Sequence, residues 1–216
     1  FTSLLALLFL GVTAEPRGRE RRLLCAAVIG AVGTTWVRVE GFAWVVGIVL
    51  AAAVASRATG GAPRGARARL AAALAMAAAA LALQLVLRRA IFGEWLPNTV
   101  AAKTGVDRGV LAARGLRYVA SWALVGITPL FAALALVPAL KHERLVARRT
   151  ALAGAGVTAG FVVYCLVVGG DWMPFFRFLA PVAPMLALVI AIGADRRAMP
   201  LGPLIPAGTA AIQPLA

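Results

Sequence analysis

The sequence predicts an all-α, polytopic membrane protein, and three observations lead to this fold class. Of the 216 residues, 62% are hydrophobic and 14% are charged, and the mean hydropathy is +0.91. The hydrophobic residues form seven apolar runs separated by polar loops, and Lys and Arg concentrate in alternate loops. So few polar side chains cannot cover the surface of a soluble protein of this length. The apolar runs are therefore predicted to lie in a bilayer.

Each apolar run is expected to form one transmembrane helix. The runs comprise residues 1–14, 23–37, 42–55, 70–87, 118–140, 151–168 and 178–194. Several are shorter than the roughly 20 residues that an ideal crossing needs. Flanking Arg and Trp side chains can compensate, because their apolar parts lie in hydrocarbon while their polar ends reach the interface. We expect about seven transmembrane helices with short loop helices on the outer face.

The loops predict how these helices are oriented. Loops 15–22, 56–69, 141–149 and 195–197 hold 14 of the 22 Lys and Arg residues. The alternate loops 38–41, 88–117 and 169–177 hold the other 8, together with 4 of the 8 acidic residues. Because cytoplasmic loops carry an excess of Lys and Arg, the first set is predicted to be cytoplasmic and the second extracytoplasmic.

Other classes of protein fit the composition less well. The net charge of +14 suggests nucleic acid, but its cations lie in short clusters between apolar runs, so no nucleic-acid partner is predicted. Cys25 and Cys165 lie inside apolar runs and are expected to be small buried hydrophobes rather than disulfide or zinc residues. His142, the only histidine, is expected to be a polar loop residue. No metal and no cofactor are predicted.

The chain is expected to be an N-terminally truncated piece of a longer protein. Phe1 opens inside an apolar run without an initiating Met. Residues 1–197 are predicted to form a transmembrane domain whose first part is missing. Residues 198–216 carry four prolines among apolar residues, which prevents a regular helix over most of this tail and leaves it unassigned.

The turn Arg38-Val39-Glu40-Gly41 is the first unusual feature of the predicted outer face. It places a cation and an anion two residues apart at the membrane surface. One interpretation is an Arg38 that binds a phosphate, with Glu40 orienting it or a sugar hydroxyl. The alternative is a turn whose two charges only extend toward water.

The loop after residue 87 is the second feature. Trp95 is typical of an interface anchor. Pro97 and Asn98 are expected to start a short surface helix, since Pro is tolerated in a first helical turn and Asn caps it. Lys103 then follows roughly one and a half turns after Asn98.

A second helix in this loop is expected to begin at Asp107, which can cap it. Val106, Val110 and Ala113 share one face at helical spacing. Three cations lie elsewhere on it: Arg108, Arg114 and Arg117. The spacing suits a helix in the headgroup plane and equally suits packing against the spans. So many cations on the outer face favour an anionic ligand there, and attraction to phospholipid in general is the alternative.

The third feature is the polar segment 169–177 between two apolar runs. Its two glycines, Gly169 and Gly170, allow a sharp turn. Asp171 and Arg177 either pair across a tight loop or hold a ligand, because ionisable residues this close to hydrocarbon are costly unless they are paired, hydrated or bound. Three aromatic residues beside Arg177 suit a polyprenyl tail and its phosphate: Trp172, Phe175 and Phe176.

These three features resemble motifs of one enzyme family. Residues 38–41 resemble its R-P-E-G turn, with Val39 in place of Pro. Residues 92–103 resemble its Y-F-G-x-x-x-P-N-T-x-x-A-K loop, and residues 169–178 its G-G-D-W-M-x-x-x-R-F segment. The family is that of bacterial C-type (GT-C) membrane glycosyltransferases, and the chain is most similar to actinobacterial terminal arabinofuranosyltransferases of the cell envelope. The resemblance covers about residues 23–197.

The resemblance implies an enzyme of the bacterial inner membrane, with its active face outside the cytoplasm. Such an enzyme moves a sugar, arabinofuranose or mannose, from a polyprenyl phosphate donor to a glycan or lipid acceptor, with inversion. The family's catalytic base is a carboxylate in the first outward loop, which is expected upstream of Phe1, so this piece is expected to be inactive alone. Neither Glu40 nor Asp171 has that position.

Charge development indicates which residues act on the donor. The leaving polyprenyl phosphate gains negative charge, and cations in a partly dehydrated site stabilise that change. The expected cations are Arg38, Lys103 and Arg177, sharing one outward cavity with Asn98 and Asp171. Two other classes stay open: a transporter or lipid flippase, and a non-catalytic partner subunit. Transporters usually hold ionisable residues near the bilayer midplane, whereas here Gln84 is the one strongly polar residue deep in an apolar run.

Overall fold

The computed structural model describes residues 1–15, 18–38, 40–62, 65–95, 107–170, 176 and 178–195. These residues form helices and turns, and no strand occurs among them. The helices are α1 Thr2–Thr13, α2 Glu20–Val37, α3 Gly41–Ala58, α4 Ala66–Phe92, α6 Arg108–Val125, α7 Ile127–Leu140, α8 Leu145–Val168, the short 3₁₀ helix η1 Ala180–Val182 and α9 Ala183–Gly193. The predicted all-α class is confirmed, and the unassigned tail 198–216 lies outside the described residues.

The lengths of these helices support three or four membrane crossings. Among the described residues, α3, α4 and α8 are each long and apolar enough to cross a bilayer. The bent pair α6 and α7 adds a fourth crossing if the two helices count as one span. Each of the seven apolar runs does lie in helical structure, but α1 and the η1–α9 segment are short. The expected count of seven crossings is therefore not confirmed.

The run 118–140 does not form one straight helix. It is divided at Gly126 between α6 and α7, whose axes meet at 81°. Pro129 gives the physical reason, because it has no N–H to donate to the carbonyl of Val125, four residues earlier, and its ring would clash with that carbonyl. Proline is tolerated in the first turn of a new helix, which is where Pro129 lies in α7.

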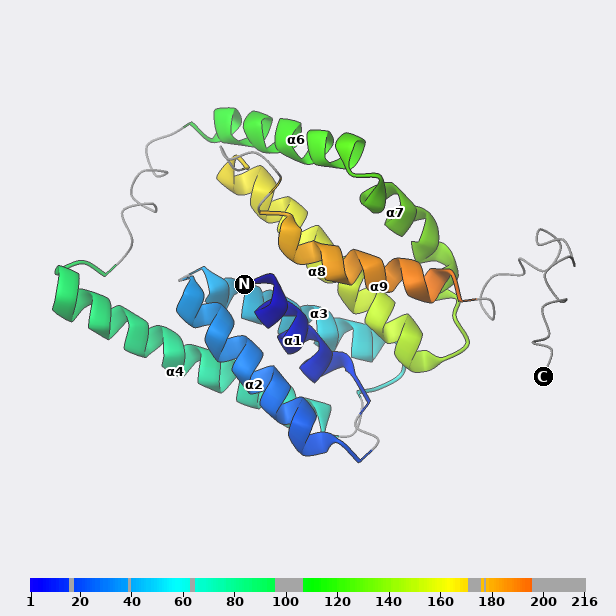
Figure 1. Cartoon of the computed structure of the whole chain (residues 1–216), viewed down its shortest axis with the longest axis horizontal. Helices are drawn as coiled ribbons and strands as arrows, with labels where there is room; N and C mark the ends of the chain where they lie inside the picture. Colours follow the sequence, from blue (N-terminus) through cyan, green and yellow to red (C-terminus); the bar gives the residue numbers. More distant parts are fainter. Residues whose placement is uncertain are drawn as a thin grey trace, which may run out of the picture.

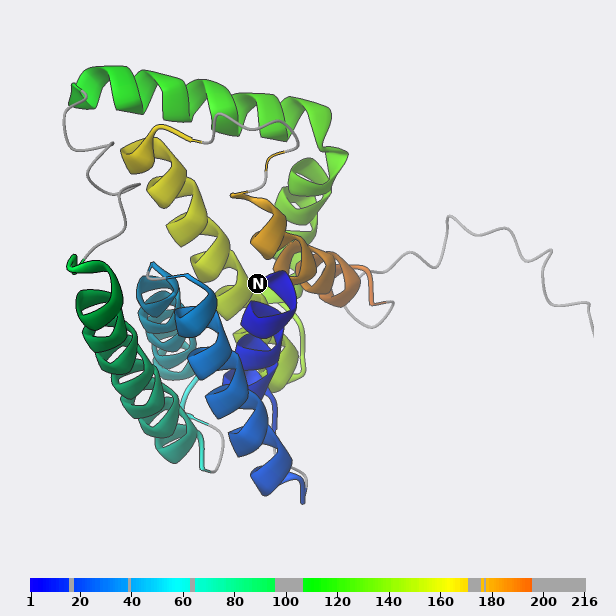
Figure 2. The same ribbon diagram turned by 60° about the vertical axis from the view of Figure 1, so that its left-hand side comes forward.

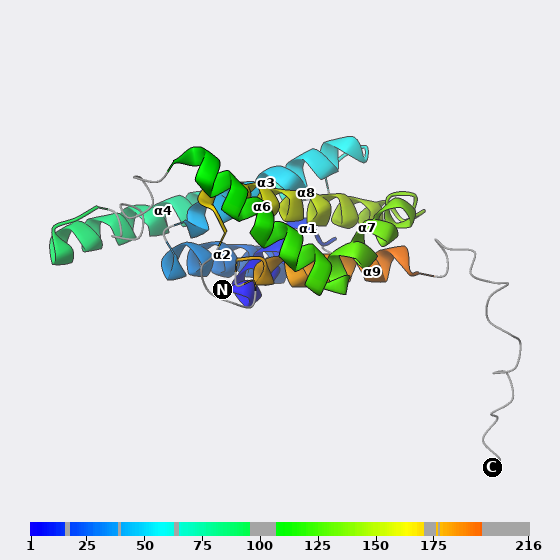
Figure 3. The same cartoon turned by 90° about the horizontal axis from the view of Figure 1, so that it is seen from above.

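The helices form two groups that meet along α3 and α8. Helices α1 to α4 pack together, and α6 to α9 form the second group (Figure 1). Helix α6 lies across the end of α8 (Figure 2), and it crosses over α8 when seen from above (Figure 3). The core between the groups consists largely of aliphatic and small side chains, with Phe161 as its largest fully buried member.

Glycines let α1 and α2 approach at backbone distance. A Cβ atom added to Gly11 would lie 2.5 Å from the backbone nitrogen of Ala27. One added to Gly30 would lie 2.5 Å from the backbone nitrogen of Leu8. Backbone atoms cannot move aside as a side-chain end can, so larger residues would force the two helices apart. The two helices consequently form a tightly packed hairpin.

One end of the molecule gathers most of the described cations, and we call it the basic end. It comprises the ends of α1, α3, α7 and α9 and the starts of α2, α4 and α8. Arg69 Nη2 of α4 donates to the carbonyl of Ala14 at 3.0 Å. Arg149 of α8 donates from Nε to Thr59 Oγ1 at 3.2 Å and from Nη2 to the carbonyl of Gly61 at 2.5 Å. These bonds fasten the loops of this end to one another.

One of two expectations about single residues was wrong. His142 lies in the α7–α8 loop as expected, and it is buried there, with 4% of its surface accessible. Its Nε2 lies 3.3 Å from Asp195 Oδ2, and its Nδ1 accepts the N–H of Arg144 at 3.0 Å, so it joins the α7–α8 loop to the end of α9. Cys25 is exposed on α2, whereas Cys165 is buried as expected. Hydropathy alone does not reveal which face of a helix packs against protein.

Candidate functional site

The α2–α3 turn holds its two charges in a fixed pair. Arg38 Nε donates to Glu40 Oε1 at 2.9 Å, and Nη2 makes a second bond to the same oxygen. Both side chains are about one third exposed, at 32% and 36%. Gly41 follows because a Cβ there would lie 2.1 Å from the carbonyl oxygen of Thr34. The pattern R-x-E-G thus has a packing requirement at its last position and an oriented cation at its first.

Arg38 also lies over two aromatic rings from distant parts of the sequence. Its guanidinium carbon is 5.7 Å from the ring centroid of Phe1 and 5.5 Å from that of Phe178. Cations at such distances are attracted by the negative face of the ring. Phe178 is buried, so the contact is partly shielded from water. The turn after α2 and the segment after α8 therefore meet here, at what we call the aromatic end.

Further aromatic residues extend this contact into the core. The ring centroids of Phe178 and Tyr164 are 5.8 Å apart, and those of Tyr164 and Trp44 are 4.8 Å apart. The ring of Trp44 stacks on that of Phe161, with 3.5 Å between the centroids. Such ring pairs contribute beyond the area that they bury. They fix the position of Phe178, and through it the ring under Arg38.

Helix α6 covers the glycine turn at the end of α8. Gly169 and Gly170 have φ angles of +83° and +71°, in the left-handed region that favours glycine. A Cβ on Gly169 would lie 2.8 Å from the side chain of Leu111, and one on Gly170 would lie 2.7 Å from Cβ of Tyr118. The predicted sharp turn is confirmed, and α6 leaves no room for larger residues in it.

The start of α6 agrees with the sequence, and the exposure of its apolar residues separates the two alternatives for this helix. Asp107 Oδ1 accepts the N–H of Val110 at 3.1 Å, which confirms the predicted cap. Val110 and Ala113 are exposed, which fits the alternative of a helix in the headgroup plane and not the alternative of packing against the spans; Val106 lies outside the described residues. Within α6, all of which is described, Gly115 is the one buried residue. A Cβ there would lie 2.4 Å from the carbonyl oxygen of Cys165, so the face of α6 toward α8 runs through positions 111, 115 and 118.

Four of the predicted site residues can be located. Arg38, Glu40 and Phe176 lie at the aromatic end, where the ring of Phe176 meets that of Tyr118 at 5.5 Å. Trp95 is 54% exposed after α4, with the Arg89 guanidinium 6.0 Å from its ring centroid. The other six lie outside the described residues: Asn98, Lys103, Asp171, Trp172, Phe175 and Arg177. The expected shared cavity stays a prediction.

Sequence reasoning missed the aromatic framework of this site. Tyr118 and Tyr164 are the only tyrosines in the chain, and both contact the segment 176–178. Their position near the ends of apolar runs was a usable signal, since tyrosine favours places where one side is apolar and the other is polar. Phe1 and Phe178 carried no such signal, because phenylalanine is common in any apolar run.

Three further findings bear on the site. Among the described residues, no group of three or more His, Cys, Asp or Glu side chains is placed to hold a metal ion. Comparison with protein-family models, with curated proteins and with solved structures finds no match.

An apolar groove of about 430 Å³ lies between α1 and α9, lined by Ala6, Phe9, Leu10, Pro184, Met185, Ala187, Leu188 and Ala191.

Tyr118→Phe is expected to loosen the segment around Phe178. The Phe178 N–H donates to the Tyr118 hydroxyl at 3.1 Å, and the substitution removes this acceptor but keeps the ring. Loss of a partner for a partly buried N–H costs about 1–3 kcal/mol. Hydrogen exchange followed by mass spectrometry should show faster exchange in peptides covering 178–182. Peptides from α3 serve as the internal control, and unchanged exchange at 178–182 would contradict the bond.

Proposed function

We propose that this chain is part of a membrane glycosyltransferase that moves a sugar from a polyprenyl phosphate donor to a glycan or lipid acceptor. One observation carries the proposal: the Arg38 guanidinium lies over the ring of Phe178. Arg38 belongs to the turn that resembles R-P-E-G, and Phe178 ends the segment that resembles G-G-D-W-M-x-x-x-R-F. Two motifs that are far apart in the sequence thus meet at one end of the molecule, as one binding site requires.

Arg38 has the properties of a phosphate ligand. Its guanidinium stays charged, and its planar donors match phosphate oxygens. Glu40 and two rings orient it, while about one third of its side chain remains accessible. In our proposal it stabilises the charge that develops on the departing polyprenyl phosphate, in a partly dehydrated site where this attraction is stronger than in water. Glu40 orients Arg38 rather than acting as the base.

The remaining proposed ligands come from the sequence. Lys103 and Arg177 supply further cations, and Asn98 and Asp171 supply hydrogen bonds. Trp172, Phe175 and Phe176 flank the first units of the polyprenyl tail. Neither Glu40 nor Asp171 is assigned as the catalytic carboxylate, so the proposal assigns only the donor-phosphate wall to this chain.

The groove between α1 and α9 suits the rest of the polyprenyl tail. Its lining is almost entirely apolar. Both of its helices begin beside Arg38, because Phe1 directly precedes α1 and Phe178 shortly precedes η1 and α9. A donor with its phosphate at Arg38 has an apolar path along these two helices. A polyprenyl chain is apolar and matches this lining.

The finer membrane arrangement belongs to the same proposal. It comprises seven crossings in a bacterial inner membrane, with the aromatic end outside the cytoplasm and α6 in the headgroup plane. Helix α6 exposes three cations together with apolar side chains such as Leu116 and Leu124, as interfacial helices do. The cations are Arg108, Arg114 and Arg117. The basic end then faces the cytoplasm, in line with the excess of cations there.

Transfer of radiolabelled sugar from polyprenyl phosphate donors tests the proposal. The full-length protein in membranes is compared with Arg38→Ala, Lys103→Ala and Arg177→Ala. Each variant is expected to lose transfer by roughly a hundredfold at normal abundance, in keeping with the loss of one charge-stabilising donor. Arg57→Ala, which removes an exposed arginine at the basic end, is the matched control and should keep wild-type activity.

Two results would contradict the proposal. Full activity in all three variants would show that these residues do not form the phosphate site. No transfer by the wild-type protein across a broad donor panel would favour a transporter, a lipid flippase or a non-catalytic partner subunit. The structure gives the transporter less support, because Gln84 Nε2 donates to the carbonyl of Trp36 at 3.0 Å and so links α4 to α2. The bond gives the amide nitrogen of Gln84 a structural role, while Gln84 Oε1 has no hydrogen-bond partner among the described residues.

A further inference from the structure

Two polar atoms near the end of α4 are buried without a hydrogen-bond partner among the described residues. They are Oε1 of Gln84 and Nε of Arg88. An amide oxygen can only accept a hydrogen bond, and a guanidinium N–H can only donate one. Buried polar atoms are normally satisfied, so an unsatisfied pair indicates a place for a ligand or a water. An acceptor and a donor are thus open at neighbouring positions of one helix.

Gln84 and Arg88 lie in line with the face of α4 that packs against α2. The buried residues of α4 form one stripe at helical spacing: Ala66, Arg69, Ala73, Ala77 and Ala80. Gln84 and Arg88 continue this stripe, and residues four apart on a helix are neighbours on its surface. Both side chains as a whole remain partly exposed, so a ligand can reach them from outside.

The hydrogen bond from Gln84 to α2 identifies which of its amide atoms is open. Nε2 donates to the carbonyl of Trp36 at 3.0 Å. Because a carbonyl can only accept, this bond requires the nitrogen and leaves Oε1 as the open atom. Trp36 is the last residue but one of α2, and Arg88 lies about 6 Å further along α4 than Gln84. The pair therefore lies where α4 extends past the end of α2 (Figure 1).

The two open atoms together select a hydroxyl group as their ligand. A hydroxyl can donate to Gln84 Oε1 and accept from Arg88 Nε at the same time. A phosphate or carboxylate group has no proton to offer Oε1, and an ammonium group would be repelled by the guanidinium of Arg88. A single water molecule meets the same requirement as a hydroxyl and is the alternative ligand.

An exposed aromatic ring beside Arg88 favours a sugar over a lone water. The ring centroid of Phe92 lies 5.6 Å from the Arg88 guanidinium carbon, and Phe92 is 67% exposed. Sites for small ligands combine apolar or aromatic surface with a few placed polar groups. A sugar offers both hydroxyl groups and an apolar C–H face, whereas a water would make no use of the ring.

We propose that Gln84 and Arg88 hold a hydroxyl group of a sugar, so that the end of α4 is a carbohydrate-binding subsite. This inference deepens the glycosyltransferase proposed above and rests on it for the source of the sugar, which is the donor or the acceptor glycan. The subsite adjoins the proposed phosphate ligand through α2, because Arg38 follows Trp36 by two residues.

Saturation-transfer difference NMR of the full chain in detergent micelles tests the subsite without any transfer reaction. The probes are methyl α-arabinofuranoside and methyl α-mannopyranoside, each with analogues that lack one hydroxyl group. The wild-type protein is expected to bind one parent glycoside and to bind one of its deoxy analogues roughly tenfold more weakly, from the loss of a hydrogen bond to a charged donor. Arg88→Lys keeps the charge but removes Nε–H, and Gln84→Met removes Oε1. Both variants should bind the parent and that analogue equally.

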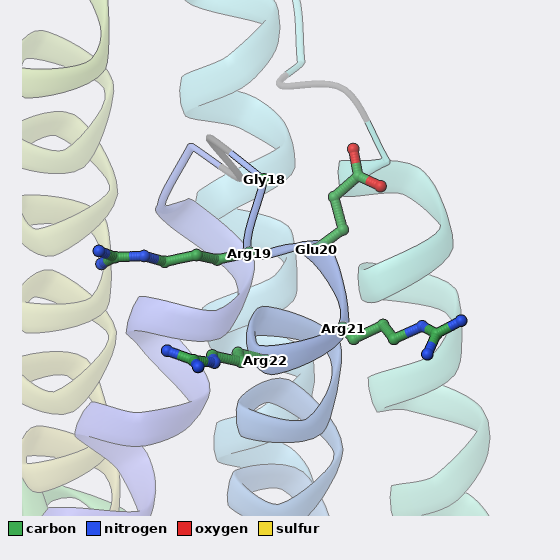
Figure 4. Close-up of a pocket in the computed structure, with 5 residues that line it drawn as sticks. All are labelled: Gly18, Arg19, Glu20, Arg21 and Arg22. Atoms are coloured by element: carbon green, nitrogen blue, oxygen red, sulfur yellow. The ribbon is translucent and has the colours of Figure 1, made fainter.

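Two arginines outside the subsite provide matched controls. Arg89→Lys makes the same change at the next, exposed position of α4. Arg21→Lys makes it at the basic end, in the exposed segment 18–22, which lines an open hollow of about 580 Å³. The side chains of this segment extend in different directions, with Arg21 opposite to Arg19 and Arg22 (Figure 4). Both controls should keep the wild-type preference for the parent glycoside.

Three results would overturn the subsite. They are a wild-type protein that binds neither glycoside or all analogues equally, a preference that persists in Arg88→Lys and Gln84→Met, and a preference that is lost equally in the controls. Sugar transfer is measured separately. A preference without transfer would refute the proposed function and leave the subsite, whereas transfer without a preference would do the reverse. Where both hold, a raised KM for the acceptor or for the donor in Arg88→Lys identifies which sugar is bound.

Discussion

Replacing Gly115 by alanine is expected to move α6 away from α8 and to expose Cys165. The added Cβ would lie 2.4 Å from the Cys165 carbonyl oxygen and 2.7 Å from Cα of Leu166. Both are backbone atoms, so the helices have to separate, at a cost of about 1–3 kcal/mol. Alkylation by N-ethylmaleimide measures the result, in a Cys25→Ser background because Cys25 is already exposed. Modification of Cys165 should become roughly tenfold faster or more.

Gly160→Ala provides the control for this experiment. Gly160 lies in the same helix as Cys165, and a Cβ there meets nothing within 4 Å. The alkylation rate in this variant should equal that of the parent. Because α6 also covers the turn at Gly169 and Gly170, the proposed sugar transfer should fall in Gly115→Ala and stay unchanged in Gly160→Ala. A folded Gly115→Ala protein with an unchanged Cys165 rate would show that α6 does not pack here.

Arg149→Leu is expected to destabilise the whole protein by about 3 kcal/mol, since it removes two hydrogen bonds made by a charged donor. Arg149 is buried at the start of α8, and it bonds to Thr59 and Gly61 in the loop after α3. Leucine fills part of the space but leaves the Gly61 carbonyl without this donor. The loop then loses its attachment to α8. Urea unfolding in detergent micelles, followed by tryptophan fluorescence, measures the change.

The neighbouring Arg148 separates this effect from the loss of a charge. Arg148 is only partly buried, and Arg148→Leu changes the net charge by the same amount. Its unfolding free energy should stay within about 0.5 kcal/mol of the parent, as for most surface substitutions. If both variants are destabilised equally, the buried hydrogen bonds of Arg149 are not the cause.

The sequence predicted which residues are helical better than it predicted where a helix breaks and bends. Each apolar run is helical in the structure, as expected for a backbone that has to satisfy its own hydrogen bonds in the absence of water. Helix α4, for example, extends beyond both ends of the run 70–87. The prediction of one helix for residues 118–140 was wrong because the hydropathy of this run is continuous. The break between α6 and α7 depends instead on the missing N–H of Pro129. Hydropathy registers how apolar a residue is, and it does not register which hydrogen bonds its backbone can make.

Those parts of the candidate site that depend on residues close together in the sequence could be predicted. The Arg38–Glu40 pair and the glycine turn at 169–170 depend on neighbours in sequence; the turn was expected, and an Arg38 oriented by Glu40 was one of two interpretations. The contact between Arg38 and Phe178 was not, because it depends on how α2 and α8 pack. The buried roles of His142 and Arg149 were missed for a related reason. A basic loop residue is normally solvated, and it becomes buried only when several loops converge on it.

The shortness of α7 and α9 has a consequence for the bilayer itself. Helix α7 has 14 residues and α9 has 11, so they rise about 21 Å and about 17 Å, against a hydrocarbon thickness of about 30 Å. The two pack directly together, with the Gly193 backbone against Ala135, so their shortfalls coincide. In the proposed arrangement, where both helices cross the membrane, the lipid beside them has to thin locally. Such hydrophobic mismatch draws a protein toward thinner membrane regions.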